Sequence, residues 1–436
     1  MKAYLIAAAS AGMLLAGCRA APDVETVDAE AAKPVGNSAV DMNANAEAAA
    51  PSADAAAPDL SQLSPATLQR LQRVATLFEP DVIVNNFSNM DEVMLTRDVS
   101  VGASPDFPVD LAPLPETVRF GAREVGVEDF LTETDTTSLL VLHDGVVKFE
   151  DAYLGTSLED QRVSWSVAKS FLSALVGRAI ANGDIPNVDV QVTDYVPELE
   201  GTAYDGASLR NVLNMASGVE FDEDYFDPQS DINMMGQEIA MGGSLDGFVS
   251  RMTERAFEPG KFNQYVSMDT HVIGQVLRAA TGRTIYDLFE EAYAPVGLGP
   301  VNYITDGEGE AFVLGGLNMT TRGYAAFGEL FRNNGMWEGE QIIPADWVAE
   351  STTISAPPPY GNADGARTYG YQWWSLPDQA EHGDYFANGI YGQTIYVNPS
   401  LETVIVKTSA DQEFQSATVP TIRVMRQIAE HYANAG

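Results

Sequence analysis

The chain has 436 residues, of which 62 are acidic and 24 are basic, so its formal net charge is −38. This charge argues against binding of nucleic acid, or of an anionic membrane surface, through the folded part of the chain. Solubility or a salty habitat explains the charge more simply. The length fits a large enzyme core with a subdomain, and Cys18, the only cysteine, excludes an intramolecular disulfide.

The N-terminus has the pattern of an export signal. Over residues 1–18, Lys2 precedes an apolar stretch that ends in Leu15-Ala16-Gly17-Cys18. This ending resembles the lipobox of bacterial lipoproteins, in which the cysteine becomes the lipidated first residue. We therefore expect a protein of the bacterial cell envelope, in the periplasm or at the outer membrane, whose membrane contact is a lipid anchor at Cys18. A plain signal peptide with an incidental cysteine is the alternative.

The segment that follows is poor in large apolar residues. Residues 19–62 are rich in Ala, Asp, Glu and Pro, and such a segment cannot bury enough surface to offset its ordering entropy. We expect an acidic, disordered linker there and a folded domain over residues 63–436.

The folded part has strand patterns at both ends and helix patterns in the middle. Helices are predicted over residues 63–78, 166–182, 208–216, 271–280 and 421–432. Strands are predicted over residues 138–143, 146–149, 369–374, 393–397 and 403–406. No pattern assigns residues 80–130, where prolines recur. The order predicts an α/β (α+β) domain, a sheet flanked by helices, with a helical subdomain inserted between its halves.

Ser166-Val-Ala-Lys169 opens the helix predicted over residues 166–182. Lys169 lies one turn beyond Ser166 on the same face, so its amine can reach the serine hydroxyl. A lysine whose pKa is lowered by burial can take the proton of such a hydroxyl and make it a nucleophile. The plainer interpretation is an amphipathic helix with one snorkelling lysine.

A lysine base needs a second proton carrier for the leaving group, and a tyrosine near a cation can serve. Tyr265, Tyr360 and Tyr396 each stand two residues before a serine or an asparagine. Tyr396 belongs to a hairpin and Tyr360 to a Pro/Gly/Asn loop, whereas Tyr265 stands rigidly just before a helix. We therefore favour Tyr265, with Ser267 beside it.

An oxyanion hole needs two backbone N–H groups aimed at one point. Ser166, at a helix start, can supply one. The stretch Asn388-Gly389-Ile390-Tyr391 opens a strand, where a glycine lets substrate approach and the Ile390 N–H can be the second donor.

These motifs together resemble the penicillin-binding and class C β-lactamase superfamily of serine hydrolases. The sequence between these motifs also resembles that superfamily, in the stretches Val192-Thr-Asp-Tyr-Val-Pro, Leu209-Arg-Asn-Val-Leu-Asn-Met-Ala-Ser-Gly and Pro259-Gly-Lys-Phe-Asn-Gln-Tyr265. The resemblance covers roughly residues 130–410 and implies a β-lactamase/DD-peptidase-like fold with an antiparallel sheet. It also implies an acylated Ser166, a Lys169 base, a Tyr265 proton shuttle, a supporting Ser267 and an oxyanion hole of the Ser166 and Ile390 amides.

One departure bears on the substrate. β-Lactamases and peptidases of the superfamily carry Lys-Thr-Gly where this chain has Ala387-Asn388-Gly389, so a β-lactam carboxylate loses its usual partner. The sequence after it resembles instead the esterase and 6-aminohexanoate-dimer hydrolase branch. That branch places a tyrosine from a loop over the substrate, and Tyr225 resembles it. Asn388, Gly389 and Tyr391 would also face the substrate, a small ester or amide.

Two further readings stay open: a cell-wall peptidase or β-lactamase, and a catalytically silent surface protein that only binds. No Gly-x-Ser-x-Gly elbow of an α/β-hydrolase is present. The four histidines are scattered, without metal-ligand spacing. We expect neither a metal nor an organic cofactor.

Overall fold

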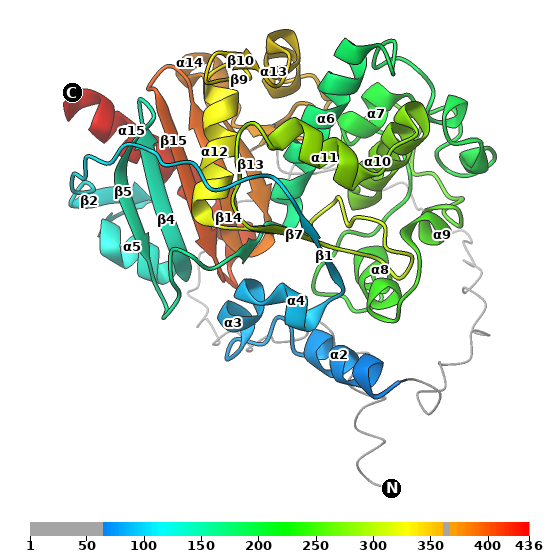
Figure 1. Ribbon diagram of the computed structural model, residues 1–436, viewed down its shortest axis with the longest axis horizontal. Coiled ribbons are helices and arrows are strands. Elements are labelled where there is room, and N and C mark those ends of the chain that lie inside the picture. The colour runs from blue at the N-terminus through cyan, green and yellow to red at the C-terminus, as the bar shows by residue number, and fades with distance from the viewer. Residues whose placement is uncertain (1–63, 361–366, 436) are drawn as a thin grey trace, which may run out of the picture.

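The computed structural model describes residues 64–360 and 367–435 (Figure 1). The leader predicted over residues 1–18, with Cys18, and the linker predicted over residues 19–62 lie outside the described residues. Within the described ranges, no helix is both long enough and apolar enough to cross a membrane.

A seven-stranded sheet unites the two ends of the folded chain. Its strand order is β11-β12-β13-β14-β15-β4-β5, and all neighbours are antiparallel. The strands are β4 (Thr136–His143), β5 (Val146–Ala152), β11 (Thr368–Tyr369), β12 (Trp374–Ser375), β13 (Tyr385–Gly389), β14 (Gln393–Asn398) and β15 (Thr403–Ser409). The predicted antiparallel sheet is thereby confirmed. The single strand predicted over residues 369–374 is wrong, because a turn in which Gln372 has φ 65° separates β11 from β12.

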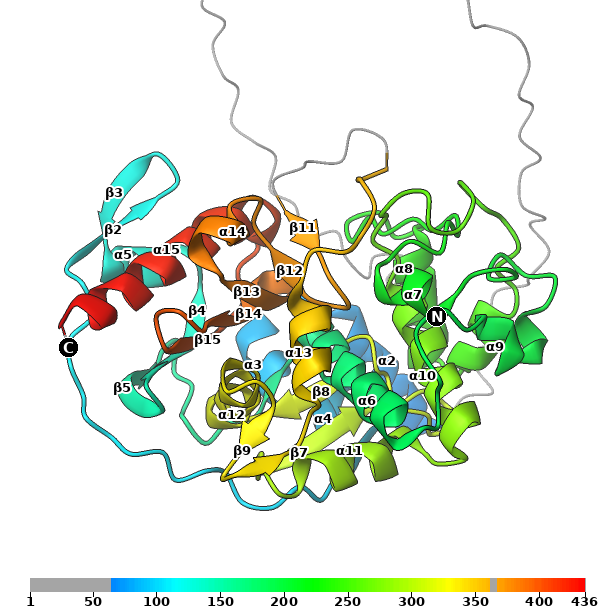
Figure 2. The same cartoon turned by 90° about the horizontal axis from the view of Figure 1, so that it is seen from above.

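Both faces of this sheet are buried, because alternate side chains of its strands enter different cores. Leu140 and Val406 pack in one core, and Val141 and Ile405 in the other. Helix α12 (Thr321–Arg332) covers the first face, and α5 (Val127–Glu133) and α15 (Phe414–Ala435) cover the second (Figure 2). The closing helix predicted over residues 421–432 is longer than expected, with Pro420 inside it.

The helical subdomain is inserted between the two halves of the sheet, as predicted. It contains α6 (Ala168–Asn182), α7 (Leu209–Leu213), α8 (Asp231–Ala240), α9 (Leu245–Val249), α10 (Ser267–Thr281) and α11 (Ile285–Tyr293). Three 3-10 turns accompany them: η2 (Trp165–Val167), η3 (Val192–Asp194) and η4 (Pro197–Leu199). Helix α6 ends at Gly183, whose φ of 84° is the left-handed conformation expected for a glycine stop.

The segment without a sequence assignment folds around the edges of the domain. It holds α3 (Ile83–Ser88), α4 (Met90–Val93), β1 (Thr96–Val99), β2 (Thr117–Phe120) and β3 (Arg123–Gly126). Strand β1 joins a second sheet of order β1-β7-β8-β6, with β6 (Arg162–Val163), β7 (Val301–Ile304) and β8 (Leu317–Met319). The small elements α13 (Ala345–Thr352), α14 (Gln379–His382), β9 (Met336–Trp337), β10 (Glu340–Gln341) and η5 (Ile390–Gly392) complete the described chain.

The helix predicted over residues 63–78 is α2 (Pro65–Ala75). Ser64 caps it by accepting a hydrogen bond from the Thr67 N–H, and Pro65 occupies its first position, where a missing N–H costs nothing. Figure 1 shows α2, α3 and α4 together below the junction of the sheet and the helical subdomain.

We predict that Gly177→Ala destabilises the protein by about 1–3 kcal/mol, because the added methyl group would overlap the Trp347 indole of α13. Urea unfolding of the purified domain measures this. Gly247→Ala, in α9, is the matched control because its methyl group meets only ordinary contacts. A Gly177→Ala variant as stable as the wild type would show that α6 and α13 are not packed closely.

Candidate active site

Ser166 and Lys169 lie where the sheet meets the helical subdomain. Ser166 belongs to the 3-10 turn η2 and Lys169 to the first turn of α6, so the serine precedes the helix in which it was predicted. The distance from Lys169 Nζ to Ser166 Oγ is 3.0 Å. The same Nζ lies 3.3 Å from Ser267 Oγ and 2.7 Å from the Leu314 carbonyl oxygen. The amine is thus held between two hydroxyls and one carbonyl.

The surroundings of Lys169 favour its neutral form. Its side chain is only 2% exposed, and this burial lowers the pKa of the amine to about 7, against an opposing effect of nearby Glu223. A neutral amine has a lone pair that can accept the Ser166 proton. Lys169 is therefore a competent base close to neutral pH.

Glu223 connects several of the predicted site residues. Its carboxylate accepts hydrogen bonds from the Ser267 hydroxyl (2.5 Å), the Ser267 N–H (2.9 Å) and the Tyr225 hydroxyl (2.8 Å). Burial raises the pKa of Glu223, while Lys169 and these donors oppose the rise. The loop bearing Glu223 is fixed by the Asn233 amide, which donates to three carbonyls of residues 224, 225 and 227.

The Tyr265 side chain completes the group around Ser166. Its ring centroid lies 5.4 Å from Lys169 Nζ, and the ring stacks on Trp374. Burial and then Glu223 raise the pKa of Tyr265, against a hydrogen bond with Ser166, so the phenol stays protonated and can donate a proton. Tyr396, by contrast, donates to Asp384 in the core beneath α15.

The end of strand β13 packs against η2, the turn that carries Ser166. A Cβ at Gly389 would lie 2.5 Å from the Ser164 oxygen and 3.1 Å from the Ser166 nitrogen, so only glycine fits. Ser166 lies in the 3-10 turn η2, directly before α6, where backbone N–H groups lack intrahelical acceptors. Ile390 follows Gly389 directly. The close approach thus brings this end of β13 beside the Ser166 nitrogen, and Ser166 and Ile390 line the same pockets.

The residues beside both amides are conformationally constrained. Trp165 has φ 41° and Tyr391 has φ 58°, a region that side-chain-bearing residues seldom occupy. The Phe78 ring packs on both, at centroid distances of 5.5 Å from Trp165 and 5.1 Å from Tyr391. The Gln393 amide donates to the Ile390 and Tyr391 carbonyls from the other side. Aromatic packing and hydrogen bonds thus hold both amides in place.

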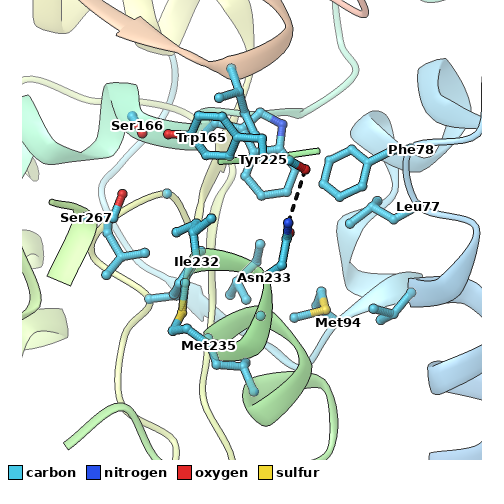
Figure 3. A pocket seen from close by; sticks show the side chains of 18 of the residues that line it. Leu77, Phe78, Met94, Trp165, Ser166, Tyr225, Ile232, Asn233, Met235 and Ser267 are labelled. Atoms are coloured by element: carbon cyan, nitrogen blue, oxygen red, sulfur yellow. Dashed lines mark hydrogen bonds between the residues drawn. The ribbon is translucent and has the colours of Figure 1, made fainter. Parts of the chain in front are cut away.

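Two pockets meet at Ser166, Tyr225 and Ile390, which line both. The apolar pocket, of about 910 Å³ including space open to solvent, is lined mainly by hydrophobic side chains, with Asn233 and Gln237 as neutral polar residues besides those around Ser166. Figure 3 shows Leu77, Phe78 and Met94 across this pocket from Ser166 and Ser267. The polar pocket, of about 750 Å³ on the same measure, is lined by Glu223, Tyr265, Arg367, Trp374 and Asn388, among others.

The structure brings together all the predicted site residues that it describes. Some form a central cluster, and others line the two pockets or support the cluster. Ser166, Lys169, Tyr265 and Ser267 form one cluster, with Ile390 beside it. Asn388 lines the polar pocket. Tyr391 lines the apolar pocket with a ring only 3% exposed. Gly389 serves the close approach of the strand, and Tyr225 binds Glu223.

Glu223, Trp165, Phe78 and Arg367 were missed from sequence. Glu223 stands in the run Asp222-Glu-Asp-Tyr, and in a chain with 62 acidic residues such a run is indistinguishable from a solvated loop. No local signal in the sequence points to the other three.

A serine with a buried lysine base and an adjacent phenol defines a serine hydrolase site. The family described as Beta-lactamase matches residues 132–430, and the chain belongs to that family. It is a hydrolase of the serine type.

Relatives carry hydrolase names. The 6-aminohexanoate-dimer hydrolase of Paenarthrobacter ureafaciens is 30% identical over 337 residues, covering 74% of this chain and 84% of that protein. A solved protein from Bacillus anthracis with the same assignment has a TM-score of 0.68 and 23% identity, and the match covers 82% of this chain and 96% of the other. A family VIII carboxylesterase has a TM-score of 0.53 at 16% identity, over 70% and 95% of the two chains. These structures support the predicted fold.

We predict that Gly389→Ala lowers kcat at least tenfold, because the methyl group would push β13 away from the Ser164 carbonyl and the Ser166 amide. Steady-state kinetics with an activated ester and circular dichroism check turnover and folding together. The Gly247→Ala variant adds the same group far from the site. Wild-type kcat in Gly389→Ala would mean that the strand end does not contribute to turnover.

Proposed function

We propose that this enzyme hydrolyses carboxylic esters or amides through an acyl-enzyme on Ser166. The observation that carries the proposal is the 3.0 Å contact between Ser166 Oγ and the buried Lys169 amine, whose pKa is lowered to about 7. The names of the relatives, an amide-dimer hydrolase and a carboxylesterase, support the same substrate class.

The proposed acylation begins when Lys169 Nζ accepts the Ser166 proton and Ser166 Oγ attacks the carbonyl carbon. The Ser166 and Ile390 N–H groups stabilise the resulting oxyanion. Tyr265 donates its proton to the leaving alcohol or amine as the acyl carbon–heteroatom bond breaks, and the Lys169 ammonium returns a proton to Tyr265. Water then attacks the Ser166 ester while Lys169 Nζ accepts a proton from it. The resulting ammonium returns that proton to Ser166 Oγ as the bond to the acyl carbon breaks and the acid is released.

Ser267 and Glu223 are positioning residues in this scheme. Ser267 touches the Lys169 amine, and Glu223 holds Ser267 through both its hydroxyl and its amide. β-Lactam or cell-wall peptide hydrolysis is less well supported, because Ala387 stands at the position of the family's lysine and is buried in the core. From the Leu15–Cys18 sequence alone, we also propose a lipid-anchored location in the cell envelope.

We predict that Ser166→Ala lowers kcat/KM for p-nitrophenyl acetate by at least about 10³-fold without loss of the fold, because the attacking oxygen is removed. Initial rates and the near-ultraviolet circular dichroism spectrum of residues 64–436 measure this. Ser173→Ala is the matched control, because Ser173 is a buried serine of the following helix α6 without a hydrogen-bond partner in the described structure. Equal rates in Ser166→Ala and the wild type would overturn the proposal.

We predict that kcat/KM rises with pH through a midpoint near 7, because the base must be the neutral Lys169 amine. The Glu223 carboxylate raises the pKa of Lys169, so Glu223→Gln should move the midpoint to lower pH. Glu220→Gln changes a neighbouring exposed carboxylate and should leave the midpoint in place. A midpoint unmoved in Glu223→Gln, or moved upward, would contradict the assigned electrostatics.

A further inference from the structure

The two pockets lie on different sides of Ser166, and one residue distinguishes their roles. Tyr265 lines the polar pocket but is not among the residues that line the apolar pocket. In the proposed function, on which this inference rests, Tyr265 protonates the leaving group. The leaving group must therefore occupy the polar pocket. The acyl group, which stays attached to Ser166, extends into the apolar pocket.

The side chains of the apolar pocket determine what kind of acyl group fits there. Figure 3 shows Leu77, Phe78 and Met94 on its far wall, opposite Ile232 and Met235, and Met90 of α4 also lines the pocket. Among the described residues that line it, none is acidic, and its one cation is Lys169 at the inner end. A cationic group at the end of an acyl chain would lose its hydration here without gaining an oppositely charged partner, because the amide side chains that line the pocket, Asn233 and Gln237, are neutral. Methionine side chains adapt readily to a flexible aliphatic chain.

The far wall is contributed by α2, α4 and the residues that directly follow each of these helices. This segment lies outside residues 132–430, the part that matches the family. It is fixed to the domain: the Arg70 guanidinium donates to the Ala240 carbonyl of α8, and the Phe78 ring packs on Trp165 and Tyr391. The wall thus has a defined position relative to Ser166.

We infer that the apolar pocket is an acyl-binding site for an uncharged aliphatic chain, and that the N-terminal segment of residues 65–94 determines the chain length accepted. The substrates are esters or amides of medium-chain carboxylic acids with a polar leaving group. The dimer of an ω-amino acid in the name of the Paenarthrobacter ureafaciens relative has an amine at the end of its acyl half, and this pocket disfavours such a group.

The first test uses the wild-type enzyme and p-nitrophenyl esters that share one leaving group. From acetyl to octanoyl, kcat/KM should rise about twofold to fourfold per added methylene until the pocket is full. The 7,7-dimethyloctanoyl ester and the 6-(trimethylammonio)hexanoyl ester have the same shape and differ in charge. The neutral ester should be hydrolysed at least tenfold faster in kcat/KM. Equal values for this pair, or a flat chain-length profile, would overturn the inference.

The second test asks whether the N-terminal segment determines the preference for acyl chain length. Met94→Trp should lower the octanoyl-to-acetyl ratio of kcat/KM at least tenfold, because the indole occupies the far end of the pocket. Leu95→Trp changes the adjacent residue, which is 39% exposed and outside the pocket, and should keep the wild-type ratio. An unchanged ratio in Met94→Trp would overturn the assignment of the wall.

These outcomes separate the inference from the proposed function. If no ester is hydrolysed in a Ser166-dependent manner, the proposed function fails and the acyl site fails with it. If hydrolysis depends on Ser166 but ignores chain length and charge, only the acyl site fails. The wild-type comparison of the charged and neutral esters does not require that any variant folds.

Discussion

The burial of one amine determines most of what this molecule can do. Lys169 is enclosed by α6, the start of α10 and the Leu314 backbone, three segments far apart in the chain. Enclosure removes water from the ammonium and lowers the pKa of Lys169 to about 7, so the neutral amine is well populated near neutral pH. Had the helical subdomain left this side chain in solvent, Lys169 would be an ordinary cation, and Ser166 an unreactive alcohol. The packing of the domain is in this sense part of the chemistry.

The buried Lys169 amine and the nearby Glu223 carboxylate affect each other's protonation state. Glu223 raises the pKa of Lys169, and Lys169 opposes the rise in the pKa of Glu223 that burial causes. The Ser267 and Tyr225 hydroxyls and the Ser267 N–H satisfy the carboxylate oxygens, so the pair does not need water. The same hydrogen bonds orient Ser267 toward the amine. One carboxylate therefore tunes the charge of the site and fixes its geometry.

Local patterns predicted helices α2, α6, α7, α10 and α15 and strands β4, β5, β14 and β15, but not the other elements. Spacing predicted the Ser166–Lys169 contact, because helix periodicity places i and i+3 on one face. The hairpin at Asp144-Gly145 and the pairing of β14 with β15 follow from the same kind of signal. Tertiary neighbours could not be predicted in this way. Glu223 acts through burial, which no pattern in an acidic loop reveals, and Phe78 acts through contacts with Trp165 and Tyr391, 87 and 313 positions further along the chain. The sequence predicts one strand over residues 369–374 in place of the two-residue strands β11 and β12, because aromatic residues also occupy the turn between them.

The pairing of β4 with β15 affects how the enzyme folds during its synthesis. Val141 and Ile405 are register partners, yet the chain between them includes the whole helical subdomain. During synthesis from the N-terminus, β4 and β5 emerge long before their neighbour in the sheet, and contacts of such sequence separation form slowly. The strand that brings Ile390 to Ser166 is also made long after the turn that carries Ser166. The nascent chain therefore cannot assemble the complete site until synthesis has passed β13.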